Sequence, residues 1–186
     1  MAPLLAILGA GRAVRFGSDK LAQPVAGRPL ALHALAAAHA TGLPLIWIGG
    51  AYPPTYLPPE VEVLDNPVAD RGLATSVALA ARTAQARGHP ALLIHLADMP
   101  CVSPALLSAL AEQPGPAACR HPDGRPGVPA QLPARLFHDL IGLSGDHGAG
   151  ALLAGLPDLT LLIPDHAELL DVDTSATLAE TERFLS

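Results

Sequence analysis

The chain has 186 residues, a length that fits one domain, residues 1–186, with a substantial core. Hydrophobic residues make up 50% of it but aromatic residues only 3%, so Leu, Ala, Val and Ile must form most of that core. A net charge of -6 argues against a broad basic surface for nucleic acids or anionic membranes, and no apolar run reaches membrane-spanning length.

Two features of the sequence indicate the cellular compartment: its cysteines and its first residues. Cys101 and Cys119 form neither a CxxC pair nor a dense disulfide framework. The first eight residues are apolar but carry no basic leader, unlike a signal peptide. We therefore expect a cytoplasmic protein.

Strands and helices alternate in the first two thirds of the chain. Residues 3–8 form an apolar run that stops at a Gly-Ala-Gly turn, as a buried strand does. Further strands are predicted at residues 44–48, 61–64 and 91–96, and helices at residues 29–40, 72–87 and 103–112, with Gly42 past the end of the first helix and Ser103 as N-cap of the last. This alternation predicts a Rossmann-like, three-layer α/β/α fold with a mostly parallel sheet.

The last third is less regular. We expect a loop at residues 123–129, a helix at 133–143, a Gly-Asp-His-Gly turn, a strand at 159–163 and a final helix at 175–184. In open parallel sheets, ligands bind beyond the carboxyl ends of the strands. Both the glycine turn and Asp98 follow such strand ends, which makes them the first candidates for a site.

The loop at residues 8–21 combines glycines with two arginines and a lysine. Glycines let backbone N–H groups approach phosphate oxygens closely, and Arg15 and Lys20 supply the charge that a triphosphate needs. The spacing matches neither a Walker loop, which needs Gly-Lys-Ser/Thr, nor a dinucleotide loop, which needs a small residue where Val14 stands. A solvated turn with incidental charges is the minority interpretation. The predicted nucleotide-binding residues here are Leu8, Gly9, Ala10, Gly11, Arg12 and Gly17.

Two carboxylates are candidate metal ligands. Asp98 follows a buried strand and faces the predicted triphosphate loop, as a Mg²⁺ ligand would. A capping role for Asp98 is weaker, because Ser103 is better placed to cap the next helix. Asp173 offers a second carboxylate, although it is equally well interpreted, with Thr174, as a cap of the final helix.

The run Leu-x-Ala-Gly-x-x-x-Arg-Phe-Gly-x-x-Lys, followed by Pro24 and Gly27-Arg28-Pro29-Leu30, resembles the signature of the MobA-like nucleotidyltransferases. It is most similar to the molybdenum cofactor cytidylyltransferase branch, although Gly9 replaces the usual first Ala and Ala13 a frequent Ser. The Ala-Asp-Met-Pro string around Asp98 resembles the metal-binding motif of the same family, and Asp171-Val172-Asp173-Thr174 resembles its late Asp-x-Asp-Thr motif.

The resemblance implies a nucleotide-diphospho-sugar transferase fold, with the NTP bound by about residues 1–115 and the acceptor by about 116–170. It places Asn66, Gly72 and Ser76 near base and ribose, although Asn66 is also an ordinary turn residue. Acceptor-side motifs of the branch resemble residues 126–129 and 143–152, which makes Gly127, Pro129, Gly145 and Asp146 acceptor-binding candidates. The branch often has His where Val128 stands and Arg where Gly150 stands.

The implied activity is Mg²⁺-dependent transfer of a nucleoside monophosphate from an NTP, CTP in that branch, to a phosphorylated acceptor, molybdopterin in that branch, with release of pyrophosphate. Arg15, Lys20 and Asp98 would be its catalytic residues. Two alternatives remain open: a guanylyl- or sugar-1-phosphate-transferring relative, and a non-catalytic nucleotide sensor or cofactor chaperone.

Partners follow from the same interpretation. We expect a monomer or weak dimer that binds no nucleic acid and no membrane, and that makes transient contact with a molybdoenzyme. The histidines lack paired ligand spacing, so no zinc site is predicted, and Cys101 is expected to be a packing residue.

Overall fold

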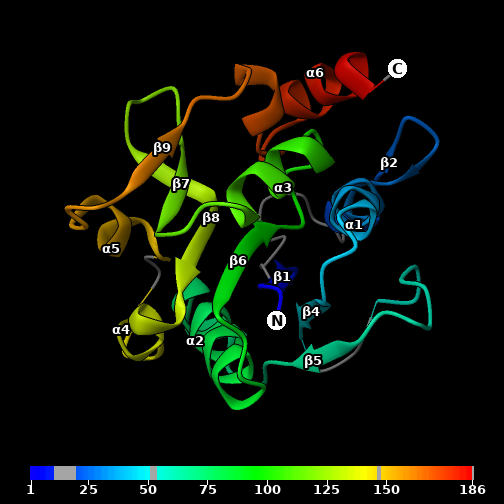
Figure 1. Cartoon of the computed structure of the whole chain (residues 1–186). Coiled ribbons are helices and arrows are strands. Elements are labelled where there is room, and N and C mark those ends of the chain that lie inside the picture. The colour runs from blue at the N-terminus through cyan, green and yellow to red at the C-terminus, as the bar shows by residue number, and fades with distance from the viewer. Residues whose placement is uncertain (11–19, 51–53, 146–147, 186) are drawn as a thin grey trace.

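The main sheet of the computed structural model, which describes residues 1–10, 20–50, 54–145 and 148–185, runs through the centre of the molecule (Figure 1). Its strand order is β5-β4-β1-β6-β8-β7-β9. The strands are β1 Leu4–Leu8, β4 Leu45–Gly49, β5 Val63–Asp65, β6 Ala91–Leu96, β7 Ala117–Arg120, β8 Pro126–Pro133 and β9 Thr160–Leu162.

The directions of the strands determine which strand ends lie at the same edge of the sheet. β5, β4, β1 and β6 are mutually parallel, β8 is antiparallel to both of its neighbours, and β9 is parallel to β7. The carboxyl ends of β1, β6, β7 and β9 therefore lie along one edge of the sheet.

Helices cover both faces of the sheet. The α-helices are α1 Leu30–Ala40, α2 Leu73–Ala86, α3 Pro104–Ala111, α4 Phe137–Ile141, α5 Gly150–Ala154 and α6 Ser175–Leu185. Short 3-10 helices are η1 Lys20–Ala22, η2 Ala69–Arg71, η3 Ala134–Leu136 and η4 His166–Leu169, and β2 Pro24–Val25 pairs with β3 Arg28–Pro29.

The core consists of two apolar clusters, one on each side of the sheet. Leu5 and Ile7 of β1 pack with residues of α1 and α3, whereas Leu4 and Ala6 pack with residues of α2 and α4. Because both faces are covered, every residue of β1 is buried, as the continuous apolar run predicts. The Rossmann-like three-layer α/β/α fold is confirmed.

Helix boundaries in the first two thirds agree with the predictions to within one residue. Ser103 caps α3, because its Oγ accepts a hydrogen bond of 3.2 Å from Leu106 N. Gly42, just past α1, has a φ of +68°, the left-handed conformation that favours glycine. None of the described helices is both long and apolar enough to cross a membrane.

The last third differs from the prediction. The expected loop at residues 123–129 is wrong, because β8 begins at Pro126 and pairs with both β6 and β7. β7 and α5 were not predicted. The helix expected at 133–143 is shorter: a 3-10 turn leads into α4, which ends at Ile141. The strand at 159–163 and the final helix are confirmed.

Candidate active site

One lysine and three aspartates meet at the carboxyl edge of the sheet. Nζ of Lys20 lies 2.8 Å from Oδ2 of Asp98, 3.0 Å from Oδ1 of Asp173 and 3.9 Å from Oδ1 of Asp171. One carboxylate oxygen from each aspartate lies within 4.8 Å of the others. We refer to these four residues as the carboxylate cluster.

Main-chain hydrogen bonds hold Asp98 and the later aspartates together. Ala97 N donates to Leu8 O at 3.1 Å, which ties the end of β6 to the end of β1. Val172 N donates to Asp98 O at 3.1 Å. Val172 is fully buried, and Asp173 N donates to Asp171 O at 3.1 Å, so a tight turn around Val172 brings the carboxylates of Asp171 and Asp173 to Asp98.

Lys20 enters the cluster from η1. The next residue, Leu21, is buried in the core on the α1 side of the sheet and anchors this short helix. Burial of Lys20 acts to lower its pKa, but the charges and hydrogen bonds of Asp98 and Asp173 outweigh it, so the pKa is raised. The ammonium group therefore stays charged and offsets part of the negative charge of the three carboxylates.

Asp171 belongs to the site, although the sequence predicted only Asp98 and Asp173 as metal ligands and named Asp171 only within the late Asp-x-Asp-Thr motif. Burial raises the pKa of its carboxyl to about 7, and the neighbouring Asp98 and Asp173 add to this, while Lys20 acts in the opposite direction. The signal that the sequence offered was the spacing: two aspartates flank the apolar Val172, which the core can bury while both carboxylates stay at the surface.

The donor set fits a hard divalent cation. Three carboxylate oxygens converge within 4.8 Å, and oxygen ligands are those that Mg²⁺ and Mn²⁺ prefer. The surplus of negative charge around one ammonium group favours a further cation. The cluster therefore suits a magnesium-like ion rather than zinc, which prefers His and Cys ligands.

The two interpretations of the Asp-Thr pair before α6 can now be separated. Thr174 Oγ1 accepts a hydrogen bond of 3.1 Å from Thr177 N, and Thr177 Oγ1 accepts one of 3.0 Å from Thr174 N. Thr174 thus caps α6. Asp173 instead contacts Lys20, which leaves its carboxylate in the cluster.

The glycine loop begins on a fixed backbone. Gly9 N donates to Ile48 O at 2.8 Å, and Leu8 is 5% exposed, so only its main chain is near the edge. The buried Trp47 ring fills the space beside Gly9: a Cβ there would lie 2.8 Å from Trp47 Nε1 and closer still to ring carbons. This packing accounts for the glycine at position 9. Ala10 follows, whereas Gly11, Arg12, Arg15 and Gly17 lie outside the described residues.

Asn66, Gly72 and Ser76 come together at the start of α2. Asn66 Nδ2 donates to Thr75 Oγ1 and to Ser76 Oγ, both at 2.9 Å, and its Oδ1 accepts from Val68 N at 3.3 Å. Asn66 and Ser76 are buried, and Gly72 has a φ of +114°. Their observed contacts fix the entry into α2, and direct contact with a nucleotide stays a prediction.

The acceptor-side candidates lie on two elements. Gly127 and Pro129 are on β8, near the edge that carries Asp98. Gly145, with a φ of +81°, belongs to the connection between α4 and α5. Asp146 lies outside the described residues.

A family model and a similar protein of known sequence both match most of the chain. Residues 5–160 match the family model described as MobA-like NTP transferase domain. The chain is 30% identical over 200 residues to the purine catabolism protein PucB of Bacillus subtilis (strain 168), covering 96% of this chain and 95% of that protein.

Two solved structures share the fold over nearly the whole chain. Rv0371c of Mycobacterium tuberculosis H37Rv, solved in complex with manganese, has a TM-score of 0.77 and 25% identity, covering 100% of this chain and 98% of that one. A nucleotidyl transferase from Methanothermobacter thermautotroptrophicus has a TM-score of 0.80 and 22% identity, covering 99% and 98%.

Proposed function

Because the chain belongs to the MobA-like NTP transferase family, we propose that it transfers a nucleoside monophosphate from an NTP to a phosphorylated acceptor. The observation that carries this proposal is the carboxylate cluster: Lys20 lies within 3.0 Å of Asp98 and Asp173 at the carboxyl end of β6. Such an edge is where ligands bind in open α/β sheets.

Asp98, Asp171 and Asp173 would hold a divalent metal ion, which we propose to be Mg²⁺. When bound, the metal supplies positive charge to phosphate oxygens. The manganese complex of Rv0371c supports a divalent ion in a protein of this fold.

In the proposed reaction, an oxygen of the acceptor phosphate attacks the α-phosphorus of the NTP. The new P–O bond forms as the bond from the α-phosphorus to the bridging oxygen breaks, and pyrophosphate leaves with that electron pair. The acceptor phosphate is already ionised at neutral pH, so no general base is required. Lys20 would offset charge at the α-phosphate and Arg15 would bind the β- and γ-phosphates, which is mainly a contribution of positioning and charge.

We propose CTP as the nucleotide and molybdopterin as the acceptor, on the strength of the motif resemblance to the cytidylyltransferase branch. Residues 1–115 would bind the nucleotide and 116–170 the acceptor, within one domain. Cys101 and Cys119 are both free and buried, which fits the reducing cytoplasm. Transient contact with a molybdoenzyme that receives the product belongs to the same proposal.

The test is pyrophosphate release with Mg²⁺ and each of CTP, GTP, ATP and UTP, with and without molybdopterin. We expect release only with CTP and molybdopterin together. Release with GTP, or with a sugar 1-phosphate as acceptor, would replace the proposed substrates by those of a guanylyl- or sugar-1-phosphate-transferring relative. Tight nucleotide binding without release for any acceptor would favour a sensor or chaperone and overturn the enzymatic proposal.

A further inference from the structure

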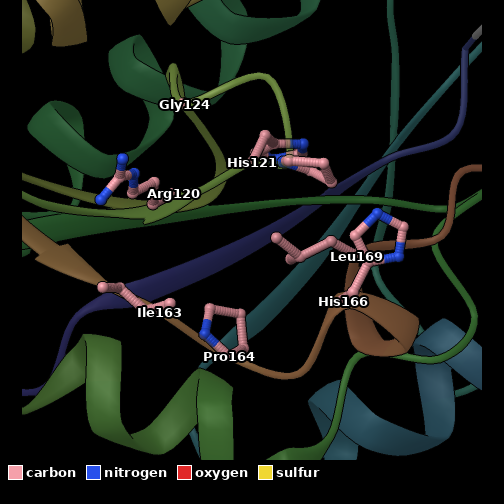
Figure 2. A pocket seen from close by; sticks show the side chains of 8 residues that line it. Arg120, His121, Gly124, Ile163, Pro164, His166 and Leu169 are labelled. Atoms are coloured by element: carbon pink, nitrogen blue, oxygen red, sulfur yellow. The ribbon is translucent and has the colours of Figure 1, made fainter.

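A pocket of about 290 Å³ opens between the carboxyl ends of β7 and β9, away from the carboxylate cluster. Figure 2 shows Arg120 and His121 on one side of it and Ile163, Pro164 and His166 on the other, with Leu169 beside His166 and facing His121. The protein as a whole is acidic, with a net charge of -6, so an arginine and two imidazoles in one pocket form a local exception.

The ring of His121 is held in place. Its Nε2 lies 2.7 Å from the main-chain oxygen of Val128, which can only accept, so Nε2 carries the proton. The ring packs on Gly127, where a Cβ would lie 2.8 Å from ring atoms. The absence of a side chain at Gly127 therefore lets His121 lie flat against β8.

Hydrogen bonds also hold the opposite wall, which η4 forms, and the chain continues from η4 to Asp171 of the carboxylate cluster. Asp165 Oδ1 accepts from Ala167 N at 2.9 Å and begins η4, which carries His166. Glu168 Oε2 accepts from Ser103 N at 3.0 Å and ties η4 to the start of α3. Asp171 follows two residues after Leu169, so pocket and cluster share one wall.

The pocket and Asp98 lie on the same edge of the sheet, two to three strands apart. β7 is separated from β6 by β8 alone. Neighbouring strands lie about 4.8 Å apart, so the ends of β6 and β7 are roughly 10 Å apart. Gly127, at the start of β8, lies on the edge between them.

Arg120 is the charged donor best placed to bind a ligand here. Its side chain is exposed, and within the described ranges no hydrogen bond or ion pair engages its guanidinium group. The guanidinium group of Arg120 and one ring N–H of His166 provide several donors for the oxygens of one anion.

We propose that this pocket binds a second anionic group of the acceptor, besides its phosphate, with Arg120 and His166 as the donors and the ring of His121 as a fixed wall beside it. The proposal rests on the proposed function and narrows the acceptor class to a small phosphorylated molecule that carries a second anionic group.

The first test is a titration of metal-free protein with inorganic phosphate, followed by NMR of carbon-13-labelled histidines. We expect saturable shifts of the His121 and His166 ring resonances, assigned with His121→Gln and His166→Gln, in wild type and in Arg125→Ala. Arg125 is the matched control, because its side chain is 86% exposed and lies outside the pocket. The affinity for phosphate that these shifts report should be at least tenfold weaker in Arg120→Ala. No saturable shift, or equal affinity in Arg120→Ala, would overturn the proposal.

The second test is steady-state kinetics with molybdopterin. Arg120→Ala and His166→Ala should raise the KM for the acceptor at least tenfold and leave the KM for CTP unchanged. An unchanged KM for the acceptor in both variants would show that the pocket does not bind the acceptor. If no acceptor supports turnover in wild type, the proposed function fails, and the phosphate titration still decides separately whether the pocket binds anions.

Discussion

The ammonium group of Lys20 lies 2.8 Å from the carboxylate of Asp98, within the same group of oxygens that we propose as the metal site. In the metal-free protein, the lysine thus offsets part of the charge that a metal ion would otherwise meet. A cation and an ammonium group compete for these oxygens, because like charges at this separation repel. The same side chain is therefore expected to weaken metal binding and to assist transfer.

Lys20→Ala separates these two effects. Removing the ammonium charge should tighten Mn²⁺ binding by about tenfold, because one repelling charge at about 4 Å is lost. Turnover should fall by about 100-fold or more, because charge at the α-phosphate is no longer offset. Electron paramagnetic resonance of free Mn²⁺ gives the affinity, and Arg87→Ala, which makes the same change in net charge at a surface ion pair, is the control. Weaker Mn²⁺ binding in Lys20→Ala would contradict this role.

Asp171→Asn tests the ligand that the sequence did not single out. The substitution keeps the shape of the side chain but removes its charge, so Mn²⁺ affinity and turnover should each fall about 10- to 100-fold. Asp139→Asn on α4 makes the same change in net charge at an exposed position outside the cluster. Isothermal titration with Mn²⁺ measures the affinity. If both variants bind Mn²⁺ as wild type does, Asp171 is not a ligand.

The contact between Gly9 and Trp47 predicts a coupled pair. Gly9→Ala places a methyl group against the buried indole and should lower the free energy of unfolding by about 1–3 kcal/mol, a typical cost of overpacking. Trp47→Leu makes room for it, so the double variant should be more stable than the sum of the two single changes by about 1 kcal/mol. Urea denaturation of all four proteins gives the coupling energy. Strict additivity would show that the ring does not exclude the methyl group.

His95 predicts a loss of stability in acid. It is fully buried in β6, and burial lowers the pKa of its imidazole to about 3. The unfolded chain takes up this proton near pH 6.5 and the folded chain does not, so stability is present above pH 6.5 and is lost as pH falls toward 3. At pH 5 this proton uptake lowers the free energy of unfolding by about 2 kcal/mol.

His95→Leu should remove that part of the acid sensitivity. Denaturant midpoints at pH 7.5 and pH 5 measure it, with the exposed His39→Gln on α1 as control. A wild-type-like difference between the two pH values in His95→Leu would show that another group is responsible.

The sequence predicted the first two thirds of the fold well because its strands are continuous apolar runs that end at glycine or aspartate. It failed at β8, where Pro126, Gly127 and Pro129 are typical loop residues. The pairing explains how β8 tolerates them: Ala118 faces Ala130 while Cys119 faces Gly127, so Val128 and Pro129 stand outside the regular ladder. Only the partner strands reveal this bulge.

The site was predicted in part for a similar reason. Asp98 and Lys20 could be singled out because each stands beside a recognisable turn or loop motif, and the structure brings them within 2.8 Å of each other. Asp171 was named only within the late Asp-x-Asp-Thr motif and not as a ligand, because the contact that brings it to the site is long-range: the hydrogen bond from Val172 N to Asp98 O. The pocket between β7 and β9 likewise forms only when both strands are in the sheet.

The most direct test of metal-dependent nucleotidyl transfer is a mass balance of CTP, molybdopterin, pyrophosphate and product, in wild type and in Asp98→Asn. We expect one pyrophosphate per cytidylylated acceptor, a strict requirement for Mg²⁺ or Mn²⁺, and a loss of about 1,000-fold or more in Asp98→Asn, which should still fold and bind CTP. Turnover in Asp98→Asn equal to that of wild type, or turnover of both proteins in excess chelator, would contradict the role that we assign to the carboxylate cluster.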